Sequence, residues 1–286
     1  MTNFLEVSDL SKHFKNFELR DISFSLPKGY IMGLIGPNGS GKTTTIKLIL
    51  NMMKRESGEV RIMGLDNLSF ENTVKSDIGA VFDSNCFCGD WTATQTERSV
   101  SAFYKNWDRE KFSSLLKKFG IAPKTKVKAL SKGMQMKLML ACAFSYNAKL
   151  LILDEPTGGL DPVSRDELLN ILSEYIEDGE HSVLFSTHIT SDLERVADYI
   201  TYINGGELFY SGSKDDLISM YCIAKGGREE LTPQMKQKAI GLREYSTGFD
   251  ALVKTADMEL FSRLDIEPAT IDDIVIFTNR KGDTYE

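Results

Sequence analysis

Long apolar runs and cysteines are both scarce in this chain of 286 residues, and each scarcity narrows the class of protein. No stretch approaches the roughly 18 consecutive apolar residues that cross a bilayer, so any membrane contact is expected to come through a partner. The four cysteines (Cys86, Cys88, Cys142 and Cys222) lack the spacing of a zinc site. The first residues do not resemble a secretion signal, which predicts a cytoplasmic protein with unpaired thiols.

Positive charge is also in deficit, because 34 Lys and Arg residues face 41 Asp and Glu residues and leave a formal net charge of -7. A surface of that sign disfavours nonspecific binding to nucleic acid, and no nucleic-acid partner is expected. A lysine-rich stretch at 117–137 is the local exception. It has two interpretations, a solvated face of a helical region or a positive field that speeds the capture of a nucleotide.

A glycine-rich loop is the most informative segment that is present. It fits the pattern Gly-x-x-x-x-Gly-Lys-Ser/Thr with Gly36, Pro37, Asn38, Gly39, Ser40, Gly41, Lys42, Thr43 and Thr44. A strand-like apolar run, 30–35, precedes the loop, and apolar residues at helical spacing follow it at Ile46, Ile49, Leu50 and Met53. Backbone N–H groups at a helix start bind phosphate, so Lys42 is predicted to reach the terminal phosphates of ATP and Thr43 to bind Mg²⁺.

Two further apolar runs end in residues that carry chemistry. The run at 150–153 ends in Asp154 and Glu155, and the run at 182–187 ends at His188. Asp154 is predicted to hold Mg²⁺ directly or through its water, and Glu155 to polarise the attacking water. His188 is predicted to donate a hydrogen bond to the γ-phosphate. Without the phosphate loop, the Asp-Glu-Pro sequence would instead be interpreted as a helix cap.

A third motif starts a helix at Ser131, whose hydroxyl is predicted to cap it and, with the backbone around Gly133, to form a second anion site. The order of motifs from the phosphate loop through Ser131, Asp154-Glu155 and Asp161 to His188 resembles the nucleotide-binding subunit of ABC transporters. The resemblance covers roughly residues 2–212.

The resemblance implies an α/β fold with a P-loop NTPase core, whose sheet is mainly parallel. It also implies a small antiparallel β subdomain and a helical subdomain inserted at about 84–145. Residues 213–286 then form a small C-terminal accessory region. In such subunits two domains pack head to tail, so Ser131 and Gly133 are expected to touch ATP held by the phosphate loop of the partner.

The resemblance also assigns roles at the edge of the site. Phe14 is expected to stack on adenine, with Phe17 as a substitute, and Asp161 is expected to lie at the dimer seam. Asp83 stands where the family usually has a glutamine that reaches Mg²⁺, so we expect it either to face the metal or to swing away. The second departure is Lys132 and Met134 on either side of Gly133, since the family pattern is Ser-Gly-Gly-Gln.

We therefore predict an ATPase subunit that binds ATP and Mg²⁺ and powers a separate integral membrane permease at the inner face of the cell membrane. The segment 197–208 and the C-terminal region favour an exporter of peptides, antibiotics or other amphiphiles. A complex for antimicrobial-peptide resistance or sensing is an alternative, as is a soluble ATPase that acts on DNA or ribosomes. The second subunit could be identical or different.

Aromatic residues after Asp83 divide between two expected roles. Phe87 and Trp91 are predicted to dock the permease, whereas Phe103 and Trp107 are expected to lie on a helix and fill the core of the helical subdomain.

Overall fold

The computed structural model describes residues 2–83 and 86–279. Residues 84 and 85, at the start of the predicted helical subdomain, and 280–286, in the predicted C-terminal region, lie outside the described residues. The strands are β1 (Asn3–Phe14), β2 (Phe17–Pro27), β3 (Ile31–Ile35), β4 (Ser57–Ile62), β5 (Leu65–Asp66), β6 (Ile78–Phe82), β7 (Leu150–Asp154), β8 (Ser182–Thr187), β9 (Tyr199–Asn204), β10 (Glu207–Ser213), β11 (Tyr221–Gly226), β12 (Gly241–Glu244), β13 (Phe249–Lys254) and β14 (Asp265–Pro268). The helices are α1 (Lys42–Ile49), α2 (Glu71–Ser76), α3 (Ala93–Ser101), α4 (Arg109–Lys118), α5 (Lys132–Ser145), α6 (Pro162–Ile176), α7 (Thr190–Val196), α8 (Lys214–Ser219), α9 (Pro233–Lys238) and α10 (Ile271–Asn279).

The central sheet has the strand order β10-β9-β3-β8-β7-β6. Strands β9, β3, β8, β7 and β6 are parallel, and β10 pairs antiparallel with β9 at one edge. Every residue of β3, β7 and β8 is buried, as the apolar runs predicted for strands that are covered on both faces. The phosphate loop, Glu155 and His188 all follow the carboxyl ends of these strands and therefore meet at one edge of the sheet.

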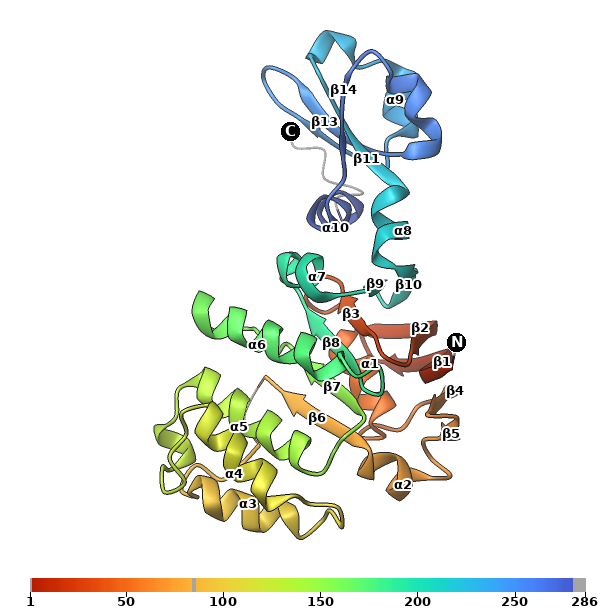
Figure 1. Cartoon of the computed structure of the whole chain (residues 1–286). Coiled ribbons are helices and arrows are strands. Elements are labelled where there is room, and N and C mark those ends of the chain that lie inside the picture. Colours follow the sequence, from red (N-terminus) through yellow and green to blue (C-terminus); the bar gives the residue numbers. More distant parts are fainter. Residues whose placement is uncertain (1, 84–85, 280–286) are drawn as a thin grey trace.

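A second, antiparallel sheet has the order β2-β1-β4-β5 and packs beside α1 (Figure 1). Its apolar face packs with α1 and with one face of the central sheet in a single buried cluster. Helix α1 is shorter than the apolar spacing predicted, because it ends at Ile49 and leaves Met53 outside it.

Helices α3, α4 and α5 gather at one end of the molecule, next to the edge strand β6 (Figure 1). Ser131 caps the start of α5 as predicted, since its hydroxyl accepts the Met134 N–H at 3.3 Å. The expectation for Phe103 is wrong: α3 ends at Ser101, and Phe103 is 84% exposed in the turn that follows. Trp107 packs against the core as expected, but it lies between α3 and α4 and not on a helix.

The C-terminal region carries a third sheet, with the order β12-β13-β11-β14, which the sequence analysis did not predict. This sheet has an apolar cluster of its own and projects away from the central sheet in Figure 1. Helix α10 returns toward α7 and buries Ile271, Ile274 and Phe277 in the cluster of the central sheet. Three hydrogen bonds between side chains join α10 to the core: one between the Tyr202 and Thr278 hydroxyls at 2.7 Å, one from Asn279 Nδ2 to the Tyr202 hydroxyl at 3.3 Å, and one from Thr190 Oγ1 to Asp272 Oδ1 at 3.0 Å.

Thr270 and Asp273 exchange hydrogen bonds at the start of α10 and so form a capping box. Among the helices within 2–83 and 86–279, none combines the length and the hydropathy of a membrane span.

Candidate active site

The phosphate loop turns tightly between β3 and α1 because glycine occupies its strained positions. Gly41 has a φ of 113°, and a Cβ atom there would lie 2.7 Å from Leu19 Cδ1. The turn brings the side chain of Lys42 back under the loop, where Nζ donates hydrogen bonds to the carbonyl oxygens of Gly36 at 2.8 Å and Pro37 at 3.3 Å. Burial lowers the pKa of the Lys42 ammonium, and the carboxylate of Glu155 opposes that shift.

Thr43 and Asp154 meet at the start of α1. Thr43 Oγ1 donates to Asp154 Oδ1 at 3.1 Å, and the same oxygen accepts from Ser186 Oγ at 2.6 Å. Ser186 is the register partner of Asp154 in the neighbouring strand β8, so the sheet itself sets this geometry. Mg²⁺ prefers oxygen ligands, and Asp154 offers a carboxylate oxygen and Thr43 a hydroxyl oxygen. Both residues therefore fit the predicted metal site.

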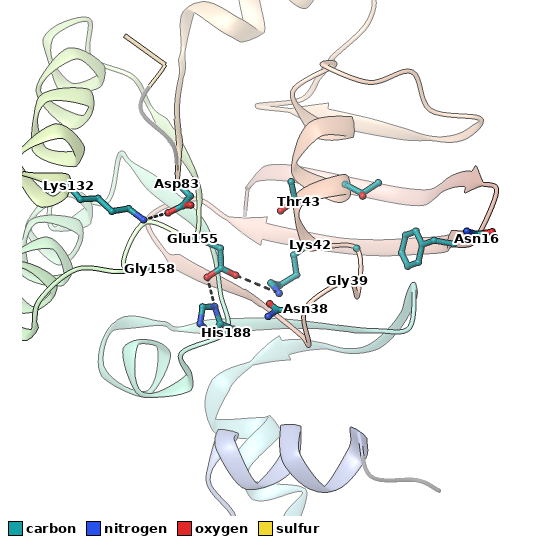
Figure 2. Close-up of a pocket in the computed structure, with 13 residues that line it drawn as sticks. Asn16, Asn38, Gly39, Lys42, Thr43, Asp83, Lys132, Glu155, Gly158 and His188 are labelled. Atoms are coloured by element: carbon teal, nitrogen blue, oxygen red, sulfur yellow. Dashed lines mark hydrogen bonds and ion pairs between the residues drawn. The ribbon is translucent and has the colours of Figure 1, made fainter. Parts of the chain in front are cut away.

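Glu155 follows Asp154 but points in a different direction. Its φ of 51° is unusual for a residue with a side chain, and its N–H donates to the Ser186 hydroxyl at 3.0 Å. This conformation places its carboxylate between two basic groups, with Oε2 2.8 Å from His188 Nδ1 and Oε1 3.7 Å from Lys42 Nζ. Figure 2 shows the three side chains converging from β3–α1, β7 and β8.

A cavity of about 750 Å³ connects these groups. Its lining includes many of the predicted residues: Asn38, Gly39, Gly41, Lys42, Thr43, Thr44, Asp83, Glu155 and His188. It also includes Asn16, Phe17, Lys132 and Gly158, which the sequence analysis did not assign to the site except for Phe17 as a substitute. Gly36, Pro37 and Ser40 belong to the loop behind the lining, and Asp154 contacts the lining through Thr43.

The aromatic side of the cavity favours Phe17 over Phe14. Phe17 lines the cavity and packs over Gly41, whereas Phe14 lies behind it with the two ring centroids 6.2 Å apart. The stacking of either ring on adenine stays a prediction.

The lining of this cavity does not include Ser131, Gly133 or Asp161, which lie at the starts of α5 and α6. Asp161 caps α6 by accepting the N–H groups of Val163 at 3.1 Å and Ser164 at 3.0 Å, and the hydrogen bonds from Ser164 lower the pKa of its carboxyl. Gly133 lets α5 approach α6 closely, since a Cβ atom there would lie 3.1 Å from Ser164 Oγ. The N-termini of α5 and α6 are therefore neighbours, and their caps form a group separate from the phosphate loop.

Asp83, predicted to face the metal or swing away, lies at the opposite wall of the cavity from the phosphate loop. Its Oδ1 accepts a charged hydrogen bond from Lys132 Nζ (Figure 2). Contact with a metal stays a prediction for this residue. Asp83 and Lys132 are both departures from the family pattern, and their charges are opposite. That opposition is the signal by which this ion pair could have been predicted from the sequence.

Comparisons with known proteins agree with this geometry. A family model described as ABC transporter matches residues 19–158. The chain is 35% identical over 193 residues to the uncharacterised ABC transporter ATP-binding protein YdbJ of Bacillus subtilis, covering 66% of this chain and 62% of that protein. It is 31% identical to the lantibiotic transport ATP-binding protein SrtF of Streptococcus pyogenes, covering 74% of this chain and 93% of SrtF.

The alignment with the probable multidrug protein YbhF of Escherichia coli, 31% identical, covers 83% of this chain and 41% of YbhF. The chain thus spans less than two thirds of the length of YdbJ and YbhF.

Solved structures share the fold. An ATP-binding subunit of an ABC transporter superposes with a TM-score of 0.68 at 29% identity, covering 75% of this chain and 91% of that one. A dimeric ATP-binding cassette in a post-hydrolysis state with ADP and Pi superposes with a TM-score of 0.65 at 22% identity, covering 73% and 98%. The α/β P-loop NTPase fold expected from the sequence is confirmed, and the chain belongs to the ATP-binding proteins of ABC transporters, whose ATPase domain it carries.

Proposed function

We propose that this chain hydrolyses ATP as one half of a head-to-tail dimer and powers a separate membrane permease. The observation that carries the proposal is the position of Glu155, held between Lys42 and His188 at the mouth of a phosphate loop. A carboxylate in that position can take a proton from water while the neighbouring Lys42 ammonium stabilises negative charge on phosphate.

The chain's residues divide the work. Backbone N–H groups of the phosphate loop bind the β- and γ-phosphates of ATP, and Lys42 moves from the loop carbonyls to the phosphate oxygens. Thr43 and Asp154 would hold Mg²⁺, which when bound would neutralise the negative charge of the phosphates. Glu155 accepts the proton of the attacking water, and His188 orients Glu155 and donates to the γ-phosphate.

The dimer is supported by the separation of two groups within one chain. Ser131, Gly133 and Asp161 belong to the α5–α6 face and not to the lining of their own cavity, so a second subunit has to supply them to each ATP. The cassette solved as a dimer with ADP and Pi has the same fold, which is compatible with this arrangement.

Export of peptides, antibiotics or other amphiphiles is supported by the likeness to SrtF, a protein named for lantibiotic transport. Resistance or sensing of antimicrobial peptides would use the same ATPase site, so the site does not separate it from export. The proposed location is the cytoplasmic face of the cell membrane, where the permease would hold the subunit.

An exposed aromatic residue is the best candidate contact for the permease. Phe103 borders a cavity of about 400 Å³ that also includes Asn72, Asp77 and Tyr104 and lies between α2 and the helical region. Trp91, the predicted contact, is 37% exposed, whereas Phe87 packs against the core. A large exposed ring beside a cavity is typical of an interface anchor.

Substitution of Glu155 tests the proposed chemistry. Glu155→Gln keeps the size of the side chain and its contact with His188 but cannot accept a proton, so turnover should fall by a factor on the order of 10² or more. ATP should still bind and should hold the mutant as a dimer, which ATPase assays and light scattering with Mg·ATP would detect. Turnover like that of the wild type would remove Glu155 from the mechanism, and a monomer with bound ATP would refute the dimer.

Substitution of Phe103 tests the permease contact. We expect Phe103→Ala to lower the fraction of the chain that co-sediments with membranes of its native cells, because a ring that anchors an interface is lost. Met258→Ala, at an exposed apolar residue of the C-terminal region, is the matched control. An unchanged membrane fraction for Phe103→Ala would place the contact elsewhere, and a wild-type chain that stays in the supernatant would favour an ATPase without a permease.

A further inference from the structure

Asp83 and Lys132 join two parts of the chain across the nucleotide cavity. Asp83 follows β6 of the central sheet, and Lys132 is the first residue of α5 in the helical region. Lys132 Nζ donates to Asp83 Oδ1, and both side chains line the cavity that holds Lys42 and Glu155 (Figure 2).

The loop after Glu155 makes room for this pair. A Cβ atom at Gly158 would lie 3.6 Å from Asp83 Oδ1, and a Cβ atom at Gly159 would lie 3.4 Å from Lys132 Nζ. Any side chain beyond Cβ at either glycine would press on the pair. The three segments that meet here are therefore the end of β6, the start of α5 and the loop that carries the catalytic glutamate.

The charges around the cavity show why the pair matters. Glu155 lies between Lys42 and His188, so Asp83 is the acidic group that faces the cavity from its other wall. A lone carboxylate there would repel the phosphates of an incoming nucleotide, because like charges interact strongly beside a low-dielectric wall. Lys132 neutralises the charge of Asp83. The pair as a whole is uncharged, like the glutamine that the family usually has at position 83.

We infer that Lys132 is a positioning residue for the nucleotide site of its own chain, which acts through Asp83. It keeps the Asp83 carboxylate neutralised and away from the phosphates, and it ties the first turn of α5 to the cavity. Because Lys132 lies between Ser131 and Gly133, the same tie fixes the segment that is offered to the partner's ATP. This inference rests on the proposed function, since it needs the cavity to bind ATP.

A double-mutant cycle on nucleotide affinity tests the inference without relying on turnover. Binding of Mg·AMP-PNP is measured by calorimetry at low salt for the wild type, Lys132→Met, Asp83→Asn and the double variant. We expect Lys132→Met to weaken binding roughly 5-fold, the upper range for an exposed ion pair, and Asp83→Asn to bind at least as tightly as the wild type. The double variant should return to within about twofold of Asp83→Asn, because no carboxylate remains to neutralise.

Lys137→Met is the matched control, since Lys137 lies on the same helix and pairs with Glu167 away from the cavity. It should bind Mg·AMP-PNP like the wild type, and circular dichroism should show all the variants folded. The difference between wild type and Lys132→Met should also shrink as salt rises, because screening weakens exposed charge interactions.

Two outcomes overturn the inference while leaving the proposed function intact. In one, Lys132→Met binds as tightly as the wild type. In the other, Lys132→Met weakens binding equally with and without the Asp83 carboxylate, which would mean that Lys132 acts on the nucleotide directly. A folded wild-type chain that does not bind Mg·AMP-PNP would instead overturn the proposed function, and the inference with it.

Discussion

The two walls of the nucleotide cavity are held by different forces. On the phosphate side, Lys42 and Asp154 are only 6% and 7% exposed, and hydrogen bonds from Thr43 and Ser186 fix Asp154. On the opposite side, the side chains of Asp83 and Lys132 are 55% and 41% exposed and depend on one ion pair. The phosphate wall is therefore organised before the nucleotide arrives, whereas the opposite wall responds to salt and to the position of α5.

The largest effect is expected for Lys42→Met, which breaks the organised wall. Turnover should fall by a factor on the order of 10² or more, because the variant lacks the buried ammonium that is proposed to reach the phosphates. The thermal unfolding midpoint should change little, because relief of a buried charge offsets the loss of its hydrogen bonds to the carbonyl oxygens of Gly36 and Pro37. ATPase assays and calorimetric unfolding check both parts, and turnover within threefold of the wild type would contradict the assigned role.

A smaller effect is expected for Ser186→Ala, which removes a support of Asp154 without touching the nucleotide. The Mg²⁺ concentration for half-maximal turnover should rise about 10-fold, a typical cost of losing a hydrogen bond to a metal ligand. Ser182→Ala is the control, because Ser182 lies on the same strand and accepts the Gly29 N–H at 2.9 Å far from the site. An equal shift in both variants would mean that strand packing, and not Asp154, is responsible.

The smallest effect is expected for Lys118→Met. Lys118 pairs with Glu174 at 2.8 Å on the outer surface, with both side chains more than half exposed. Its loss should change the free energy of unfolding by less than about 0.5 kcal/mol and leave nucleotide affinity unchanged. Denaturant titration checks the first value. A loss of nucleotide affinity equal to that of Lys132→Met would show that the lysines of the helical region act through their summed positive charge. The contrast between the Lys132–Asp83 pair at the cavity and the Lys118–Glu174 pair on the outer surface would then disappear.

The sequence predicted the organised wall better than the opposite one. Buried parallel strands appear in the sequence as apolar runs, and the residues that follow their carboxyl ends must meet at one edge of the sheet. Local patterns were therefore enough to predict that four residues lie close together: Lys42, Asp154, Glu155 and His188. The Asp83–Lys132 pair joins residues 49 positions apart in two different subdomains, and no local pattern reports such a contact. Ser186 could have been found, because it is a hydroxyl within an apolar strand that pairs with Asp154.

The C-terminal sheet escaped prediction for a different reason. Strands β12 and β14 have four residues each and contain no fully buried position, so neither shows the alternation by which strands are recognised. Phe103 was misplaced because its hydrophobicity favoured the core, whereas α3 ends two residues before it. The position of the short strands and the exposure of Phe103 both depend on where helices and strands end. Hydropathy alone does not give those ends.

The return of α10 to the core has a consequence for how the chain is made. Tyr202 and Thr278, joined by a hydrogen bond at 2.7 Å, are 76 residues apart, so the ribosome must synthesise the whole C-terminal sheet between them. At about 5–20 residues per second, that takes roughly 4–15 s. Throughout that interval the nascent ATPase core lacks the helix that packs against α7 and Tyr202, and it presents an apolar surface to chaperones until α10 arrives.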